Sequence, residues 1–351
     1  MSQEQLYRLS DGHGQAAVDH CVRALRAGGM VVIPTETVYG VGILPTHRGS
    51  LAAIKSDTDR PFSLAVDSIE RLSDELAPLN RLAQRLAKQW WPGPLTQVLP
   101  DKQGGHLGVR IPAHPWTRQL LEALGESLLL SSANLPGEPA PTHLSQLSPK
   151  VRQAVNVVVD GEALGDGQAS TVVAPGLAGL RLLRQGTVSR ADLSSVGAGQ
   201  VAVVCTGNTC RSPMAQGFLN HSLALLGEAD HSLILPTVVS AGLHANPGQP
   251  PSTGSLMAMA SRGINISRHN SRALDEQVLR QTDVLLGMTS SHVMTLLSVA
   301  APDQSVALFD PSGQEVPDPF GGPPAIYEAC ASHLAQAAHL RARSLLPIES
   351  P

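Results

Sequence analysis

The amino-acid sequence predicts an α/β protein of two domains, and three observations support this. The chain has 351 residues, about twice the usual length of one domain. Short apolar runs typical of strands alternate with stretches of helical spacing, and this alternation starts twice. The second start carries the turn CTGNTCRS between a strand-like and a helix-like segment, where many α/β folds bind phosphate.

The composition is that of an ordinary globular chain, with 42% hydrophobic and 15% charged residues. A net charge of -4 provides no overall basic field, so binding of nucleic acid would need a local patch. No apolar stretch approaches the ~20 residues of a membrane span, and the N-terminus lacks the pattern of a signal peptide. The four cysteines form neither a disulfide framework nor a zinc pattern. We expect a cytoplasmic protein with no membrane partner and no bound metal.

The first domain is predicted over residues 1–190. A helical pattern of apolar residues from Val18 to Leu25 ends at two glycines, before the strand-like run Met30–Ile33. Residues 191–199, within a stretch rich in small residues and without periodicity, are predicted to be a flexible linker. Further elements are expected as a helix at 79–88 and strands at 128–130, 157–159 and 172–173.

The second domain is predicted over residues 200–351. A strand at 201–204 leads into a helix at 213–226, and the alternation continues to a long helix at 325–346. That order predicts a small doubly wound parallel sheet. The remaining strands are expected at 238–239, 283–286 and 305–308, and the remaining helices at 255–262 and 290–299.

The turn from Cys205 to Ser212 has the residues of a phosphate-binding loop around a nucleophile. Backbone N–H groups and a helix N-terminus attract an anion, and the same environment favours the thiolate, which is the form that attacks phosphorus. Arg211 can hold two phosphoryl oxygens with its planar guanidinium. Ser212 can donate a hydrogen bond to the thiolate. Asn208 tolerates left-handed backbone angles, and its side chain can tie the loop together.

The leaving group needs a proton from elsewhere in the chain. Asp318, in the Pro-flanked segment VPDPFGG after the last predicted strand, is our choice of general acid. Asp310, which also precedes a proline, is the alternative. Either carboxylate could instead be an ordinary turn residue.

The second domain carries the motifs CTGNTCRS, SAG, GINIS, DVLLGM and DPFGG. Together these resemble the low-molecular-weight protein tyrosine phosphatases, over about residues 200–346. The resemblance implies a phosphoprotein substrate and a phosphocysteine intermediate on Cys205. It also implies that Arg211 binds the phosphoryl group and that Asp318 acts first as acid and then as base toward water. No metal or cofactor is implied for this activity.

Two loop residues bear on substrate and regulation. Thr209 resembles the branch of this family that acts on phosphoarginine, whereas tyrosine-specific members commonly carry a bulkier aliphatic residue, so both substrates stay open. Cys210 is either a packed loop residue or a redox partner of Cys205. Arsenate reduction is a weaker alternative, because no additional cysteine is placed near the end of the chain as a thiol relay would favour.

Polar residues recur at the ends of predicted elements in the first domain. The turn PTETVYG follows the strand Met30–Ile33. Cations and hydroxyls that converge on one sheet suggest an anionic ligand such as a nucleotide, and the alternative is a set of solvated side chains and helix caps. The residues concerned are Lys55, Arg60, Arg110, Ser131, Ser132, Asn134, Ser170, Thr171 and Arg184.

The first domain also carries the motifs PTETVYG, WPGPLT, GVRIP, SAN, STVV and LRQG. These resemble the YrdC-like threonylcarbamoyl-adenylate synthases, with a twisted α/β sheet, over about residues 10–190. The family converts L-threonine, bicarbonate and ATP, with Mg²⁺ accompanying the ATP, to threonylcarbamoyl-AMP and pyrophosphate. This is the first step toward threonylcarbamoyladenosine in tRNA, so tRNA or a tRNA-modification protein is an implied partner. The resemblance assigns Thr35 and Arg110 to threonine, and it assigns Lys55, Ser132, Asn134 and Arg184 to the nucleotide, with Arg60 and Thr171 in the same ligand-binding set.

One departure from that family concerns a phosphate-binding cation. The chain reads Lys55-Ser-Asp57 where the family usually has Lys-x-Arg, and Arg60 could take the place of the missing arginine. Ser131 replaces a usual proline, a milder change. The leading hypothesis is a bifunctional enzyme, synthase and phosphatase on one chain. The rival keeps the phosphatase and makes the first domain a nucleotide- or RNA-binding module without turnover.

Overall fold

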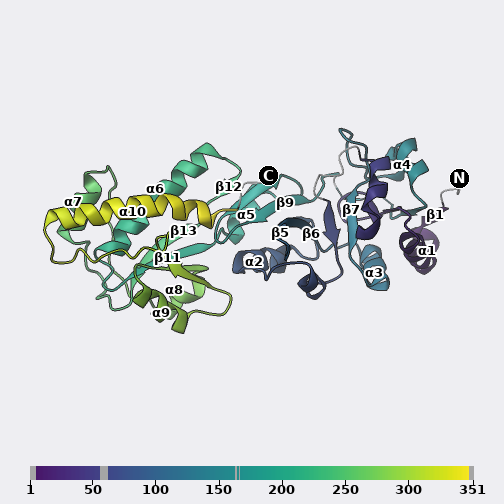
Figure 1. Cartoon of the computed structure of the whole chain (residues 1–351). Coiled ribbons are helices and arrows are strands. Elements are labelled where there is room, and N and C mark those ends of the chain that lie inside the picture. The colour runs from purple at the N-terminus through teal and green to yellow at the C-terminus, as the bar shows by residue number, and fades with distance from the viewer. Residues whose placement is uncertain (1–4, 56–61, 163, 166, 348–351) are drawn as a thin grey trace. The chain divides into compact units, whose positions relative to one another are not determined.

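The structure is a computed structural model, and the chain folds into two compact units (Figure 1). The first unit is formed mainly by the chain up to Asp192 and the second mainly by the chain from Leu193 onward. The short segments Asn80–Gln84 and Pro175–Leu182 belong to the second unit. The structure describes residues 5–55, 62–162, 164–165 and 167–347.

The first half of the chain alternates between strands and helices. The strands are β1 Gln5–Arg8, β2 Val31–Ile33, β3 Gly40–Ile43, β4 Ser63–Ala65, β5 Leu95–Pro100, β6 His106–Arg110, β7 Leu128–Ser132, β8 Val157–Asp160, β9 Thr171–Pro175 and β10 Leu180–Arg184. The α-helices are α1 Gly14–Arg26, α2 Arg81–Trp90, α3 Pro115–Leu124, α4 Pro149–Ala154 and α5 Arg190–Val196. Shorter 3-10 helices are η1 Leu9–Asp11, η2 Pro45–Ala53, η3 Glu70–Asp74 and η4 Leu144–Gln146.

The first unit is built on a mixed sheet with the strand order β1-β8-β2-β3-β7-β4-β6-β5-β9-β10. Strands β1, β8 and β2 are parallel neighbours, whereas β3 runs antiparallel to both β2 and β7. Helices α1 and α3 bury their apolar faces together with β2, β7 and β8, through residues such as Leu25 and Leu120. This core explains the helical spacing from Val18 to Leu25, because those side chains are the ones that are buried.

The turn PTETVYG connects the antiparallel strands β2 and β3, which pair Ile33 with Gly40. All three residues of β2 are buried, as expected for an interior strand of a covered sheet. The turn therefore begins where a fully buried strand ends. Its polar side chains therefore lie at the end of strand β2, where the chain turns into β3.

The second half of the chain also alternates between strands and helices. The strands are β11 Gln200–Cys205, β12 Leu233–Ile234, β13 Thr237–Gly242, β14 Val284–Gly287 and β15 Ser305–Leu308. The helices are α6 Arg211–Ala229, α7 Thr253–Ala260, α8 Glu276–Gln281, α9 Ser290–Val299 and α10 Pro324–Leu345. The expected helix at 290–299 and strand at 305–308 coincide with α9 and β15.

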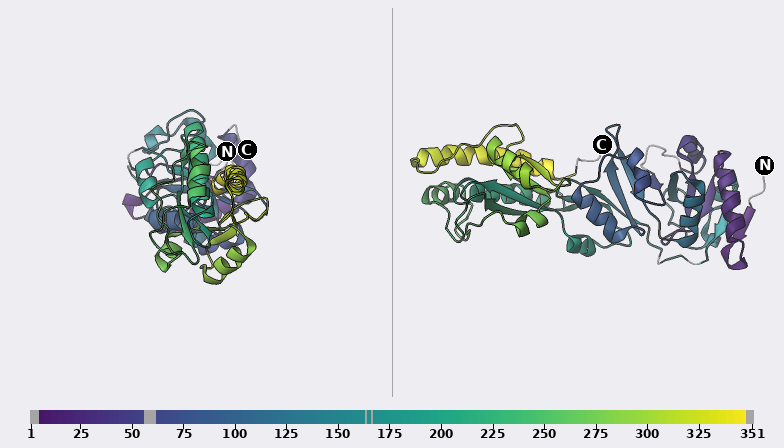
Figure 2. Two further views of the ribbon diagram at one scale, coloured as in Figure 1. Left: turned by 90° about the vertical axis from the view of Figure 1, so that its left-hand side faces the viewer. Right: turned by 90° about the horizontal axis from the view of Figure 1, so that it is seen from below.

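The second unit has a parallel sheet in the order β13-β11-β14-β15, with helices on both faces. Along β11, Val201 and Val203 contact the core shared with α6 and α10, whereas Ala202 and Val204 face α8 and α9. This alternation follows from the two-residue period of a strand. Helix α10, yellow in Figures 1 and 2, packs along α6. The predicted doubly wound parallel sheet is confirmed.

The segment predicted to be a flexible linker is ordered instead. Residues 190–196 form helix α5, so the expectation of an irregular segment at 191–199 is wrong for most of its length. Ser189 and Asp192 stabilise the first turn, because the Ser189 hydroxyl accepts the Asp192 N–H at 3.1 Å and the Asp192 carboxylate accepts the Ser189 N–H at 3.1 Å. Leu193 is fully buried and anchors the helix. Reciprocal capping and one buried leucine therefore stabilise a helix here, although the sequence has no clear helical periodicity.

Leu286 in β14 is fully buried in the core that α6 and α10 cover. We expect Leu286→Ala to lower the free energy of unfolding by about 2–5 kcal/mol, because it leaves a cavity in a packed sheet. Urea denaturation of the full chain, with hydrogen exchange of α6 amides reporting on the second unit, measures this. The control Met294→Ala, at a side chain of α9 that is 67% exposed, should change stability by less than about 0.5 kcal/mol. Equal effects of the two substitutions would contradict the assignment of this core.

Candidate active sites

The loop that joins β11 to α6 is closed by Asn208. Its backbone has φ of 55°, the left-handed conformation expected of it. Its side-chain amide donates to Ser212 Oγ at 2.8 Å, and its Oδ1 accepts the Arg272 backbone N–H at 2.8 Å. The His269 ring contacts the Asn208 carbonyl oxygen at 2.8 Å. The loop is thus fixed both from within and from the segment after α7.

Cys205 lies at the end of β11 and is almost completely buried. Its sulfur accepts the Asn208 backbone N–H at 3.3 Å and lies 3.0 Å from Ser212 Oγ. Ser212 Oγ accepts a hydrogen bond from the Asn208 amide, and two acceptors are within reach of its own proton, the sulfur at 3.0 Å and the Ala241 carbonyl oxygen at 3.4 Å. The Asn208 N–H thus points at the sulfur atom, and the Ser212 hydroxyl lies close enough to be a second donor.

Arg211 and Asp318 form an ion pair beside this loop. Arg211 Nη2 lies 2.5 Å from Asp318 Oδ2, and the side chains are 5% and 47% exposed. Arg211 Nη1 donates to the Val316 carbonyl at 3.4 Å. Within the described part of the chain, Arg211 Nε is buried without a hydrogen-bond partner. The two terminal nitrogens of the guanidinium are therefore held by the protein, and the Nε–H group has no acceptor within the described residues.

Asp310, the alternative acid, is occupied elsewhere. Its Oδ2 lies 2.7 Å from His333 Nε2, and its Oδ1 accepts the backbone N–H and the hydroxyl of Ser312 at 2.8 and 2.7 Å. Burial raises the pKa of this carboxyl, but the hydrogen bonds from Ser312 and His333 outweigh burial and leave the pKa below its ordinary value. Asp310 ties α10 to the end of β15, whereas Asp318 lies against the loop arginine.

The second loop cysteine has hydrogen-bond partners of its own. Cys210 is buried, and its thiol donates to Ser252 Oγ at 3.2 Å and lies 3.9 Å from Tyr327 Oη. A disulfide with Cys205 would require this thiol to leave Ser252. Cys330 in α10 is also buried, and burial raises the pKa of its thiol to about 12, which makes it a poor relay thiol.

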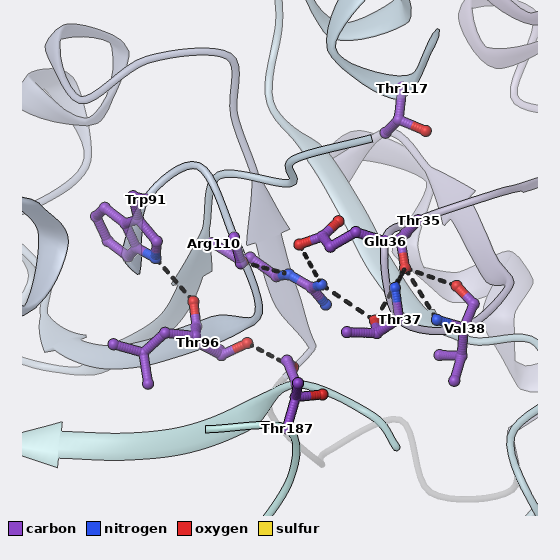
Figure 3. Close-up of polar contacts among 12 residues, drawn as sticks. Thr35, Glu36, Thr37, Val38, Trp91, Thr96, Arg110, Thr117 and Thr187 are labelled. Carbon is purple, nitrogen blue, oxygen red and sulfur yellow. Dashed lines mark hydrogen bonds and ion pairs between the residues drawn. The ribbon is translucent and has the colours of Figure 1, made fainter. Parts of the chain in front are cut away.

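In the first unit, Arg110 at the end of β6 is held by the PTETVYG turn (Figure 3). Its Nη2 donates to Glu36 Oε1 at 2.7 Å and to Thr37 Oγ1 at 3.1 Å, and its Nε donates to the Gly93 carbonyl at 3.2 Å. Thr35 is buried and donates to the Val38 carbonyl at 2.6 Å. The turn therefore folds around its own hydroxyls and fixes the direction of the arginine.

A cavity of about 140 Å³ opens beside Arg110. Its polar lining includes two of the four cations that we expected to bind ligands, Arg110 and Arg184, together with several hydroxyls. A small, partly apolar cavity with converging polar groups is the usual form of a ligand site. The lining residues are Thr35, Val38, Gly40, Phe62, Ser63, Thr96, Val98, Gly108, Arg110, Leu130, Ser131, Ser132, Ala169, Ser170, Val172 and Arg184.

Lys55, Ser132 and Asn134 come together at the end of β7. Lys55 Nζ donates to the Asn134 carbonyl at 2.6 Å and to its Oδ1 at 3.1 Å, and Ser132 Oγ donates to the same Oδ1 at 2.5 Å. Three residues predicted to serve the nucleotide are thus one hydrogen-bonded group. Asp57 stands where the family usually has a phosphate-binding arginine, and Arg60 was expected to replace that arginine. Both residues lie outside the described residues.

Ser170, rather than Thr171, faces the cavity. Thr171 is fully buried, and its hydroxyl donates to the Val188 carbonyl at 2.7 Å and accepts the Gly186 and Val188 N–H groups. Ser170 Oγ lies 2.9 Å from Thr96 Oγ1 and 3.2 Å from Arg184 Nη2. Of the two neighbouring hydroxyls that we named, Ser170 thus lines the cavity, whereas Thr171, which the resemblance places in the ligand-binding set, points into the protein.

Two family models match the chain. Residues 23–186 match the Sua5/YciO/YrdC model, described as telomere recombination. The threonylcarbamoyl-AMP synthase of Stenotrophomonas maltophilia is 32% identical over 173 residues, which are 45% of this chain and 93% of that protein. The chain belongs to the threonylcarbamoyl-AMP synthase family. Residues 200–345 match the model of the low molecular weight phosphotyrosine protein phosphatases, so both predicted resemblances are confirmed.

Other relatives of the synthase part differ in length. The Xanthomonas axonopodis synthase is 36% identical, over 41% of this chain and 86% of its own length. The Bacillus subtilis synthase is 30% identical over 49% of this chain, and the matched region spans only 54% of that protein.

Among solved structures, Escherichia coli YciO is 25% identical. The match covers 53% of this chain and 97% of the YciO chain, with a TM-score of 0.47. The YwlE arginine phosphatase from Geobacillus stearothermophilus is 28% identical, covering 42% and 92% with a TM-score of 0.37.

The synthase–phosphatase chain has polar residues at both sites that sequence reasoning did not single out. Glu36 was noted only as part of a motif, and His269 and His292 were not noted at all. A histidine in a helix or turn has no spacing that marks it, so only its contacts reveal it.

Within the described ranges, no group of three or more His, Cys, Asp or Glu side chains is placed to hold a metal ion. No helix in those ranges combines the length and apolarity needed to span a membrane.

The Asp310 contacts predict a pH-dependent contribution to stability. The folded chain holds the pKa of Asp310 below its ordinary value of about 4. This contribution is therefore complete at neutral pH and is lost as the pH falls through the lowered folded pKa. We expect Asp310→Ala to lower the free energy of unfolding by about 1–3 kcal/mol at pH 7, since it removes three hydrogen bonds to a buried carboxylate.

Urea denaturation at a series of pH values measures the difference between Asp310→Ala and wild type. This difference should shrink below about pH 4. The exposed Glu228→Gln is the control and should stay within about 0.5 kcal/mol of wild type throughout. A difference that grows in acid would show that Asp310 is held in its protonated form.

Proposed function

We propose that the chain is a bifunctional cytoplasmic enzyme. The first unit forms L-threonylcarbamoyl-AMP from L-threonine, bicarbonate and ATP, and the second hydrolyses a phosphorylated protein side chain through a phosphocysteine. The observation that carries the proposal is that each family's motif residues converge on a site of their own in this chain. A reducing compartment fits the second activity, because its nucleophile must be a free thiol.

The cavity of the first unit is suited to two anionic groups. Arg110 and Arg184 both line it, and burial followed by the nearby Arg110 cation lowers the pKa of the Arg184 guanidinium. An anionic ligand relieves the repulsion between two such cations. Arg110 takes the threonine carboxylate, with Thr35 beside it. Arg184 and the group of Lys55, Ser132 and Asn134 take the ATP.

The reaction then has two bond-forming steps. The threonine amine adds to the bicarbonate carbon with loss of water, which gives a carbamate. A carbamate oxygen attacks the α-phosphorus of ATP and displaces pyrophosphate. Mg²⁺ enters with ATP, held by phosphate oxygens and water. The product is a carbamoyl donor for a tRNA-modifying partner.

Incubating the purified chain with ATP, threonine and bicarbonate should yield threonylcarbamoyl-AMP and pyrophosphate, detected by mass spectrometry. We expect Ser132→Ala to lower turnover about tenfold or more, because it removes a hydroxyl from the nucleotide group. Thr46→Ala, at an exposed residue of η2, is the control and should keep full turnover. Binding of ATP without any product would favour the rival, a nucleotide-binding module.

In the second unit, the Cys205 thiolate attacks phosphorus while Arg211 holds the phosphoryl oxygens. Asp318 protonates the leaving atom, and the bond from phosphorus to that atom breaks. Asp318 then takes a proton from water, which attacks phosphorus and releases phosphate and the thiolate. The Arg211–Asp318 contact places this carboxylate beside the arginine that holds the phosphoryl group. A phosphoryl group bound to Arg211 would displace the Asp318 carboxylate toward the leaving atom.

The choice of substrate rests on Thr209, which is half-buried in the loop with its hydroxyl 3.8 Å from Cys210 Sγ. A small side chain here leaves room for the planar leaving group of phosphoarginine. We expect the chain to prefer phosphoarginine over phosphotyrosine and Thr209→Ile to shift this preference toward phosphotyrosine, as phosphate release from matched peptides would measure. Cys205→Ser should abolish turnover of both substrates. Preferred turnover of phosphotyrosine by wild type would contradict the phosphoarginine assignment but not the phosphatase.

A further inference from the structure

A chain of hydrogen bonds joins helix α9 to the phosphate loop, and the proposed phosphatase mechanism does not use it. His292, in the first turn of α9, is 7% exposed. Its Nδ1 lies 2.6 Å from Thr289 Oγ1, and its Nε2 lies 3.1 Å from Thr206 Oγ1. Thr206 follows the nucleophile Cys205 directly and is exposed. The chain of contacts therefore ends on the loop, at a hydroxyl that solvent or substrate can reach.

We assign the direction of these hydrogen bonds from Thr289. It is the N-cap of α9, and its Oγ1 accepts the His292 backbone N–H at 3.4 Å. With that oxygen already an acceptor, we assign its hydroxyl proton to Nδ1, so that Nδ1 is the acceptor nitrogen of the ring. The ring proton accordingly sits on Nε2 and is donated to Thr206 Oγ1.

This polarity requires a neutral imidazole, and the surroundings of His292 favour that form. Burial lowers the pKa of the ring first, and the Arg211 cation lowers it further, against the smaller opposing effects of Asp318 and Glu315. A neutral ring has one donor and one acceptor, which is what the two threonines need. Thr206 Oγ1 thus receives a hydrogen bond, and its own proton has no assigned acceptor among these three residues.

We propose that Thr206 is a further catalytic residue of the phosphatase, whose hydroxyl donates to the phosphoryl group on Cys205, and that His292 is the residue that positions it. This rests on the proposed phosphatase function. Thr206 is adjacent to the nucleophile, and His292 lies in the electrostatic range of both Arg211 and Asp318. The hydroxyl therefore belongs to the residue next to the nucleophile, and its contact with the buried ring restricts its rotation. The hydrogen bond strengthens as negative charge builds on the phosphoryl oxygens.

The test is steady-state turnover of an aryl phosphate by the full chain with variants at the two positions. Thr206→Val keeps the β-branched shape and removes the hydroxyl, so kcat should fall about tenfold to a hundredfold, the effect of one lost hydrogen bond to a charged group. Thr206→Ser keeps the hydroxyl and should retain most of kcat. KM should change little in either variant, because the contact is made mainly in the transition state.

A double-mutant cycle tests whether His292 acts through Thr206. His292→Leu should lower kcat by a similar factor, and Thr206→Val combined with His292→Leu should be no slower than the slower single variant. His292→Gln retains an N–H group for Thr206 and should restore part of the activity. Multiplicative effects in the double variant would overturn the positioning role of His292.

The outcomes separate this inference from the function on which it rests. If wild type turns over neither the aryl phosphate nor the phosphoarginine peptide, the proposed phosphatase function is wrong. If wild type is active and Thr206→Val matches it in kcat, Thr206 is not a catalytic donor. Should His292→Leu fail to fold, judged by its thermal unfolding, the Thr206→Val and Thr206→Ser pair still decides whether the hydroxyl takes part, and His292→Gln decides the role of the ring.

Discussion

The phosphatase site depends on one backbone turn, the positive φ of Asn208. A loop whose N–H groups all point at one anion must reverse its curvature, and an L-residue other than Asn or Gly does this at a cost. The surroundings compensate, because Ser212, Arg272 and His269 all hydrogen-bond to Asn208. Gly242 on the neighbouring strand completes the arrangement. A Cβ there would lie 2.6 Å from the Thr206 carbonyl oxygen and 3.0 Å from the Asn208 nitrogen, so the SAG motif keeps space for the loop.

In the synthase site, two arginines line one small cavity, so each positive charge needs a partner. Glu36 forms an ion pair with Arg110, and Thr37 contacts the same guanidinium nitrogen. Arg184 is satisfied instead by the Ser170 carbonyl and hydroxyl, which are neutral acceptors. One cation is therefore paired with a carboxylate, whereas the other contacts only neutral acceptors in its hydrogen bonds with the described residues.

Both sites use arginines fixed by their own chain before any ligand arrives. Arg211 is held by Asp318 and the Val316 carbonyl, as Arg110 is held by Glu36, Thr37 and the Gly93 carbonyl. Holding a long side chain in place beforehand removes part of the entropy loss on binding. The two carboxylates nevertheless differ in their freedom. The Asp318 side chain is 47% exposed and can move to do proton transfer, whereas the Glu36 side chain is 19% exposed and serves as a fixed counter-charge.

The sequence by itself determined the two α/β parts, the strand–loop–helix around Cys205 and the group of motif residues in each half. Such features are local, since strand and helix periods and the chemistry of a short loop depend on neighbouring residues. Only the tertiary structure shows how Asp318 and Asp310 differ, since both precede a proline but contact different distant partners, Arg211 and His333. It also decided that Ser170 instead of Thr171 faces the cavity, that residues 190–196 form a helix, and that His292 reaches Thr206. Each of these depends on contacts between residues far apart in the chain or on the direction of a side chain, which no spacing encodes.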